Sequence, residues 1–399
     1  MPHAGDADAT HYVRRFLTAL LAIPMATEGT EKDDSHGTHT LWFHENKDKG
    51  GNPSNNIYGV SNCHVLRKDT TVEYVLRGGA AKDHVRVCGM RRFQRGLDEI
   101  MSAIAAHVVL ADYYVRQIVT LEAQNPQNPR EIRWNRRKLE EENEAIDDLE
   151  TLHDDVTKHW SNIKQRNIGH VVYAPAITVD KGRTGYTADW GVFLATEANV
   201  KDAFEGNVVD LGAIRFYLSQ FASDDFNPYS GSKYTPLQLT EMFYPLGGPT
   251  TFKYPEGRRL RIFGCATKEE LAVPAEFDSE GQHCLIVGKD GNTTDLTVGR
   301  YGGLESFTFN ASGDVSKELA IYNSGHKTTD AFAAKGDSGS LVWHMKDGQA
   351  RIVSQLHSGQ NKGASTSNHV TYCTPGWYLL DEIKKKFKYA DFYRTKWAA

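Results

Sequence analysis

The octet Lys335–Val342, which reads Lys-Gly-Asp-Ser-Gly-Ser-Leu-Val, constrains the chain more than any other stretch. Two glycines flank an Asp-Ser pair, and an apolar run follows directly. Glycine lets the backbone turn sharply enough for neighbouring N–H groups to converge, which places the Ser338 hydroxyl at the apex of the turn. The pattern predicts a serine nucleophile just before a strand. In a chain with 35 glycines, the alternative is an ordinary turn.

A serine nucleophile needs a base, and the base needs an orienting carboxylate. His64 is the candidate base because the apolar run Ile57–Val60 leads to it through a few small residues. Asp189 is the candidate carboxylate because it directly precedes an apolar strand. A buried carboxylate requires a partner, and a histidine N–H is a suitable one that also fixes the tautomer of the base. For any one of the 16 histidines, the alternative is a solvated or structural side chain.

The order of these residues and their flanks resembles the chymotrypsin/trypsin-like serine peptidase family. The Gly-Asp-Ser-Gly-Ser ending is closest to the bacterial, viral and intracellular fungal branches. The matching segments are Ser61–Val65, Asp189–Leu194 and Gly336–Ser340, and Lys289–Gly299 is similar to the strand-turn-strand that opens the second barrel.

The resemblance implies a mostly β chain with two β-barrels. It implies acyl transfer by a triad of His64, Asp189 and Ser338, with the N–H groups of Gly336 and Ser338 as the oxyanion hole. In secreted relatives a new N-terminus pairs with the Asp before the nucleophile. Here that residue is Asp337, and we expect it to find a donor within the chain.

The triad residues lie further apart in the sequence than a minimal two-barrel domain needs, so the chain carries insertions. In the first, about 94–166, apolar residues recur in steps of four and three along two runs, which predicts two amphipathic helices. Asn125–Pro129 separates them, since proline cannot continue a helix. A helix of about 30 residues extends roughly 45 Å. This hairpin is either a structural brace or a docking arm for a partner, a substrate or another copy of the chain.

The second insertion, about 213–282, is rich in glycine, proline and aromatic residues, with a short helical piece at Ile214–Phe221. Such loops usually shape access to a cleft. The expected organisation is a first barrel in 1–93 and 167–212 with the hairpin inserted, and a second barrel with a C-terminal helix in 283–399. A further helix is expected over Ala9–Ala22.

The resemblance to the peptidase family implies a substrate preference through residues at two places in the chain. Phe332 stands where the family places the base of the pocket for the P1 side chain, so a basic P1 residue is disfavoured. His357, Ser358 and Gly359 fall on the strand expected to hold the substrate, and His357 resembles the histidine that reads an acidic or amide P1 side chain in glutamyl and viral 3C-like peptidases. A strand histidine without such a role is the alternative.

Composition bears on which binding partners, disulfides and metal sites the chain is expected to have. The net charge of −5 gives no general attraction for nucleic acid or an anionic membrane. Five scattered cysteines without a Cys-x-x-Cys spacing indicate neither a disulfide framework nor a zinc site. Cys63, next to the candidate base, is expected to be a buried apolar residue and not a thiol nucleophile. The expected protein is a cytoplasmic serine endopeptidase of restricted specificity that acts on a protein or peptide and needs no metal or organic cofactor. The alternative is a non-catalytic scaffold that binds a partner through the hairpin.

Overall fold

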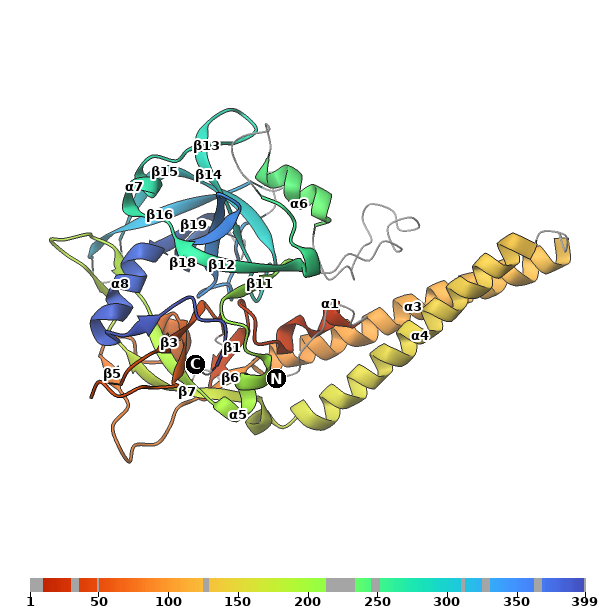
Figure 1. Cartoon of the computed structure of the whole chain (residues 1–399), viewed down its shortest axis with the longest axis horizontal. Coiled ribbons are helices and arrows are strands. Elements are labelled where there is room, and N and C mark those ends of the chain that lie inside the picture. Colours follow the sequence, from red (N-terminus) through yellow and green to blue (C-terminus); the bar gives the residue numbers. More distant parts are fainter. Residues whose placement is uncertain are drawn as a thin grey trace.

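The computed structural model describes residues 10–29, 36–48, 50–124, 129–212, 234–244, 252–309, 313–324, 331–361 and 368–397. Two nine-stranded sheets form the body of the molecule, and a long helical hairpin projects from one side of it (Figure 1). The expected fold class, mostly β with a helical insertion in a chymotrypsin-like two-barrel arrangement, is confirmed.

The first sheet is curled and runs in the order β2-β1-β6-β7-β10-β4-β3-β20, with β5 paired to β7. Its strands are β1 Pro24–Thr27, β2 Gly37–Thr38, β3 Leu41–Glu45, β4 Ile57–Ser61, β5 Tyr74–Val75, β6 His84–Val87, β7 Asn167–Ala174, β10 Gly191–Ala195 and β20 Ala390–Asp391. A separate two-stranded ribbon consists of β8 Thr178–Val179 and β9 Thr187–Ala188. Strands β3, β4 and most of β10 are buried at nearly every position, which agrees with the mainly apolar sequences of β4 and β10 and the apolar start of β3.

The second sheet closes on itself, because β18 pairs with both β17 and β19. The ring β18-β17-β14-β15-β16-β19 is therefore a six-stranded barrel, extended by β11, β12 and β13. The strands are β11 Val208–Asp210, β12 Arg259–Cys265, β13 Glu276–Phe277, β14 His283–Lys289, β15 Thr297–Phe309, β16 Val315–Asn323, β17 Leu341–Lys346, β18 Gln349–Asn361 and β19 Asn368–Pro375. Asp347 and Gly348 both have positive φ angles, of 52° and 76°, as the tight turn between β17 and β18 requires.

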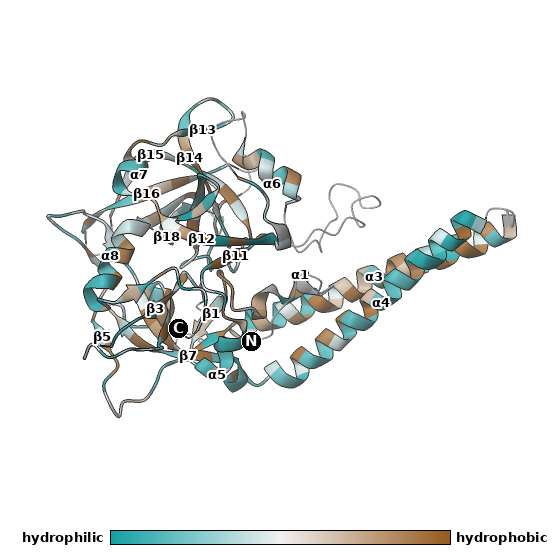
Figure 2. Ribbon diagram, viewed as in Figure 1, coloured by the Kyte–Doolittle hydropathy of each residue, from teal (hydrophilic) through white to brown (hydrophobic). Residues whose placement is uncertain are grey.

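The projecting arm consists of α3 Met90–Gln124 and α4 Pro129–Trp160. At about 1.5 Å per residue, each helix is roughly 50 Å long. Proline at the first position of α4 fits a helix start, where its missing N–H is not needed. Figure 2 shows α4 as the more hydrophilic of the two helices. Buried side chains such as Ile100, Ile104, Leu149 and Leu152 form the seam between them, so the two predicted amphipathic helices are confirmed.

The remaining helices are short. They are α1 His11–Arg14, α2 Cys63–Leu66, α5 Glu197–Val200, α6 Pro236–Phe243, α7 Lys268–Ala272 and the C-terminal α8 Gly376–Lys386, with single 3₁₀ turns at Arg15–Leu17, Ile163–Arg166, Lys201–Ala203 and Glu256–Arg258. The helix expected over Ala9–Ala22 was predicted too long, because helical structure ends at Leu17. Beyond this point Leu20, Leu21 and Ile23 are buried, and the Leu21 N–H donates to the Val208 carbonyl oxygen. The expected helical piece Ile214–Phe221 lies outside the described residues.

Candidate active site

His64 and Asp189 are brought together by two neighbouring strands of the first sheet. Strand β4 ends at Ser61, which pairs with Gly191 at the start of β10. His64 lies in α2, three residues after the end of β4, and Asp189 lies two residues before β10. Because the two strands are antiparallel, the residue after one and the residue before the other meet at the same edge of the sheet.

The contact between the two side chains is close and doubly supported. Asp189 Oδ2 lies 2.5 Å from His64 Nδ1, and Asp189 Oδ1 accepts the backbone N–H of His64 at 3.2 Å. Asn62 Nδ2 donates to the Asp189 carbonyl oxygen at 2.8 Å, which fixes the backbone beside the carboxylate. The His64 imidazole is thus held with Nδ1 toward the acid, and its Nε2 is left to face another group.

Asp189 is only 4% exposed. Burial alone would raise the pKa of this carboxyl, but His64 beside it and the hydrogen bonds from that residue hold the pKa below its usual value. Asp189 is therefore ionised near neutral pH. A buried carboxylate on Nδ1 stabilises an imidazolium, which is what a general base becomes when it accepts a proton.

Ser338 lies on the expected sharp turn just before β17. Gly336 and Gly339 have φ angles of 104° and 94°, in the region that favours glycine. A Cβ on Gly339 would lie 2.0 Å from the Thr38 carbonyl oxygen and 2.6 Å from Ser61 Oγ. The Ser338 carbonyl accepts the Thr38 N–H at 2.7 Å. The turn therefore packs directly against the strand that leads to His64.

The Ser338 hydroxyl lies 3.5 Å from the His357 carbonyl oxygen. Within the described part of the chain, no hydrogen bond joins this hydroxyl to His64. Catalytic hydrogen bonds are often long in unliganded sites and shorten when substrate binds.

The backbone N–H groups of the turn are not all used in the same way. The N–H groups of Asp337, Gly339 and Ser340 donate to Ala334, Leu356 and Asp337, respectively. In the described residues, those of Gly336 and Ser338 have no acceptor. The two N–H groups expected to form an oxyanion hole thus have no acceptor in the part of the chain that the structure describes.

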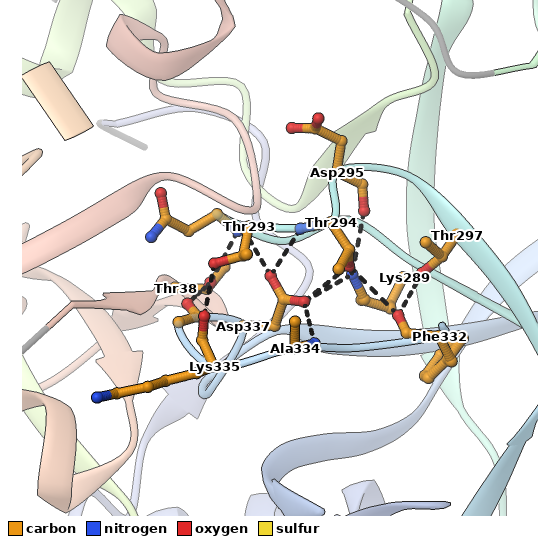
Figure 3. A network of polar contacts seen from close by, with 12 residues as sticks. Thr38, Lys289, Thr293, Thr294, Asp295, Thr297, Phe332, Ala334, Lys335 and Asp337 are labelled. Atoms are coloured by element: carbon orange, nitrogen blue, oxygen red, sulfur yellow. Dashed lines mark hydrogen bonds and ion pairs between the residues drawn. The ribbon is translucent and has the colours of Figure 1, made fainter. Parts of the chain in front are cut away.

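Asp337 is held by a dense set of donors (Figure 3). Its carboxylate accepts the N–H groups of Thr293, Thr294 and Ala334 at 2.8, 3.2 and 2.9 Å, and the Thr294 hydroxyl at 2.7 Å. Lys289 Nζ lies 3.3 Å from it, and both side chains are fully buried. Lys289 is thus the internal donor that Asp337 was expected to find.

The residues expected to form the substrate pocket lie partly in the interior and partly on the surface of the second barrel. Phe332 is fully buried in the second barrel, where its ring packs against Gly299 and lies 5.8 Å from Lys289 Nζ. Ser358 and Gly359 are exposed on β18, opposite Tyr372 and Thr371 of β19.

The imidazole of His357 is only 8% exposed, and its Nε2 lies 2.8 Å from the fully buried Glu318 carboxylate. Burial alone would lower the pKa of His357, but Glu318, together with Asp189, raises the pKa above its ordinary value. His357 and Glu318 thus form a buried pair next to Ser338, whose hydroxyl lies near the His357 carbonyl oxygen.

The side chains near His64 bear on two other chemistries, a thiol nucleophile and a metal site. Cys63 is fully buried, and burial together with the nearby Asp189 charge raises the pKa of its thiol to about 12. Such a thiol is protonated and inert near neutral pH. In the ranges that the structure describes, no group of three or more His, Cys, Asp or Glu side chains could hold a metal ion.

Several site residues were not found by sequence reasoning. Lys289 ends an apolar run and begins the segment Lys289–Gly299, which resembles the start of the second barrel. A lysine at the end of that run was the signal that could have identified it. Glu318 lies in β16, 39 residues from its partner His357, and carries no local signal. Thr38, which contacts both ends of the turn, lies even further away in the sequence.

No protein-family model and no curated sequence matches the chain. Among solved structures, a glutamic acid-specific serine protease described as using a histidine triad in substrate binding is similar at 11% identity and a TM-score of 0.36, covering 94% of this chain and all of that one. Protease A of Thermobifida fusca is similar at 10% identity and a TM-score of 0.33, covering 92% of this chain and 95% of that one. A Nocardiopsis protease is similar at 9% identity and a TM-score of 0.35, covering 93% of this chain and 96% of that one.

Proposed function

We propose that the chain is a serine endopeptidase that hydrolyses peptide bonds through an acyl-enzyme. The observation that carries the proposal is the close pair of the buried Asp189 and His64 beside a turn on which, among the described residues, the N–H groups of Gly336 and Ser338 have no acceptor. A base and an anion-binding turn in one place are what acyl transfer requires.

In the proposed mechanism, Ser338 Oγ attacks the substrate carbonyl carbon as His64 Nε2 accepts the hydroxyl proton. The carbonyl oxygen becomes an oxyanion and is stabilised by the two free N–H groups of the turn. Asp189 remains ionised and stabilises the imidazolium. His64 then donates its proton to the leaving amine, the peptide bond breaks, and water hydrolyses the acyl-enzyme with His64 again acting as base.

We propose restricted specificity that excludes a basic P1 side chain, because the fully buried Phe332 offers no negative charge at the expected pocket base. An acidic or amide P1 residue stays the proposal for His357. The Glu318 carboxylate offsets the positive charge of His357, so the pair attracts a P1 carboxylate less than a free imidazolium would, and this favours glutamine over glutamate. A histidine that only supports the strand is the alternative, and the close pairing with Glu318 is compatible with it.

A second candidate function is a scaffold that binds a partner or a second copy of the chain through the arm. The observation that favours it is a line of exposed apolar side chains along one side of α3. These are Met101, Val108, Val115 and Val119, which are 49%, 43%, 45% and 61% exposed. A scaffold needs no nucleophile, so the two functions differ in whether Ser338 reacts.

We propose the cytoplasm as the location, supported by five cysteines that are all unpaired. No helix in the described ranges is long and apolar enough to cross a membrane.

A cleavage-site profile on a denatured proteome tests the proposed activity and its specificity together. The active chain is expected to generate new peptide termini that are absent with Ser338→Ala, and a peptide panel that varies only P1 then ranks Gln, Glu, Asp, Phe and Lys. No difference between the chain and Ser338→Ala would refute the peptidase. A preference for large aromatic P1 residues would refute the role of His357.

A further inference from the structure

The base of the helical arm contacts the loop that holds the nucleophile turn. Arg95, in the second turn of α3, donates from Nη2 to the Asn292 carbonyl oxygen at 3.1 Å. The two residues are 197 positions apart, so this contact joins the insertion in the first half of the chain to the second barrel. The guanidinium is oriented by Glu99, whose carboxylate accepts from Arg95 Nε at 2.9 Å.

The loop that contains Asn292 is in turn bonded to the turn at several points (Figure 3). The Asn292 N–H donates to Thr38 Oγ1 at 3.2 Å, and this hydroxyl donates to the Gly336 carbonyl oxygen at 3.2 Å. Thr293 donates from its hydroxyl to the Lys335 carbonyl oxygen at 2.8 Å and from its N–H to Asp337. Residues on both sides of Gly336 are thus fixed by the loop.

The loop also packs tightly against the turn. A Cβ on Gly291 would lie 2.5 Å from Asp337 Oδ1, and a Cβ on Gly336 would lie 2.4 Å from Thr293 Oγ1. With so little free space, a displacement of the loop moves the turn with it. Among the N–H groups of the turn, that of Gly336 depends most on the position of the loop for its direction. Both neighbours of Gly336, Lys335 and Asp337, are bonded to the loop.

We propose that Arg95 is a positioning residue for the oxyanion turn, so that the helical arm helps to set the catalytic activity of Ser338. This inference rests on the proposed peptidase function. Arg95 touches neither the substrate nor the reacting atoms. Its guanidinium holds the Asn292 carbonyl, and the loop passes this constraint to Gly336 through Thr38 and Thr293. A ligand that binds the arm and shifts the base of α3 would therefore alter turnover without entering the cleft.

The test compares Arg95→Met with the matched control Arg116→Met, an exposed arginine further along the same helix. Methionine keeps most of the aliphatic stem of arginine and removes its donors. Removal of one oxyanion donor lowers kcat about 10²–10³-fold. Arg95 affects such a donor only through the intervening loop, so we expect a smaller loss, about tenfold in kcat, with little change in KM. Arg116→Met should retain the original kcat. Arg95→Gln serves as the second variant if Arg95→Met does not fold.

Amide hydrogen exchange supplies a readout that does not depend on activity. Arg95→Met is expected to speed exchange at Thr293, Thr294 and Ser340, whereas Arg116→Met is not. An active original chain with Arg95→Met kcat within twofold of it, or unchanged exchange at these amides, would overturn the inference. If the original chain is inactive, the proposed peptidase fails. Faster exchange in Arg95→Met would then still show the link between the arm and the turn, and unchanged exchange would remove that link as well.

Discussion

Replacing Lys289 by methionine tests whether its buried side chain holds the turn that carries Ser338, the proposed nucleophile. Lys289 and Asp337 are both fully buried with their charges 3.3 Å apart. Removing one partner of such a pair leaves an uncompensated buried charge, which costs about 3–5 kcal/mol. Asp337 keeps four other donors, from Thr293, Thr294 and Ala334, so we expect a loss at the lower end, about 3 kcal/mol. We also expect kcat to fall, because Asp337 lies between Gly336 and Ser338, whose N–H groups are proposed to stabilise the oxyanion.

The matched control is Lys317→Met. Lys317 lies at the same distance, 3.3 Å, from Glu305, but its side chain is 40% exposed. Exposed ion pairs contribute about 0–1 kcal/mol, so the control should change stability by less than 1 kcal/mol. Urea unfolding followed by tryptophan fluorescence gives the free energies, and a peptide substrate gives kcat. In Lys289→Met/Asp337→Asn, removal of the second charge should restore at least about 1 kcal/mol. Equal losses for Lys289→Met and Lys317→Met, or an unchanged kcat in Lys289→Met, would refute the reasoning.

Three further predictions follow from other contacts. Asp189→Asn should lower kcat roughly 10⁴-fold, because the amide favours the wrong tautomer of the base; a loss below tenfold in steady-state kinetics would contradict the triad. Burial raises the pKa of Glu276 to about 7, above the value of about 4.5 in the unfolded chain. The ionised side chain therefore destabilises the folded chain, and this destabilisation grows as the pH rises from about 4.5 to 7. Glu276→Gln should therefore stabilise the chain by about 1–3 kcal/mol at pH 8 and hardly at pH 4.5, whereas the exposed control Glu269→Gln should show no such pH dependence in urea titrations. Gly339→Ala should abolish activity because its Cβ would lie 2.0 Å from the Thr38 carbonyl, whereas Gly302→Ala, which meets nothing within 4 Å, should stay active.

The parts of the site that could be predicted from the sequence are those with a local signal. The glycines around Ser338 mark a turn, and the apolar runs beside His64 and Asp189 mark the strands that deliver them. The two arm helices were found because their apolar spacing repeats over many turns.

The parts that could not be predicted depend on contacts between distant segments. The charge of Glu318 is compensated by His357 on another strand, and neither residue signals the other along the chain. The contact from Arg95 to the loop before β15 is set by how the arm leaves the barrel, which no periodicity encodes. The N-terminal helix was predicted too long because an apolar run reads as helix even when it is buried on every side.

Covalent labelling of Ser338 tests the central claim most directly. A fluorophosphonate reacts with a serine only when a base and an oxyanion site activate it. We expect the intact mass to increase by one phosphonyl group per chain, peptide mapping to place it on Ser338, and both Ser338→Ala and His64→Ala to remain unlabelled while folded. A folded chain that is not labelled, or that is labelled equally well after His64→Ala, would contradict the account.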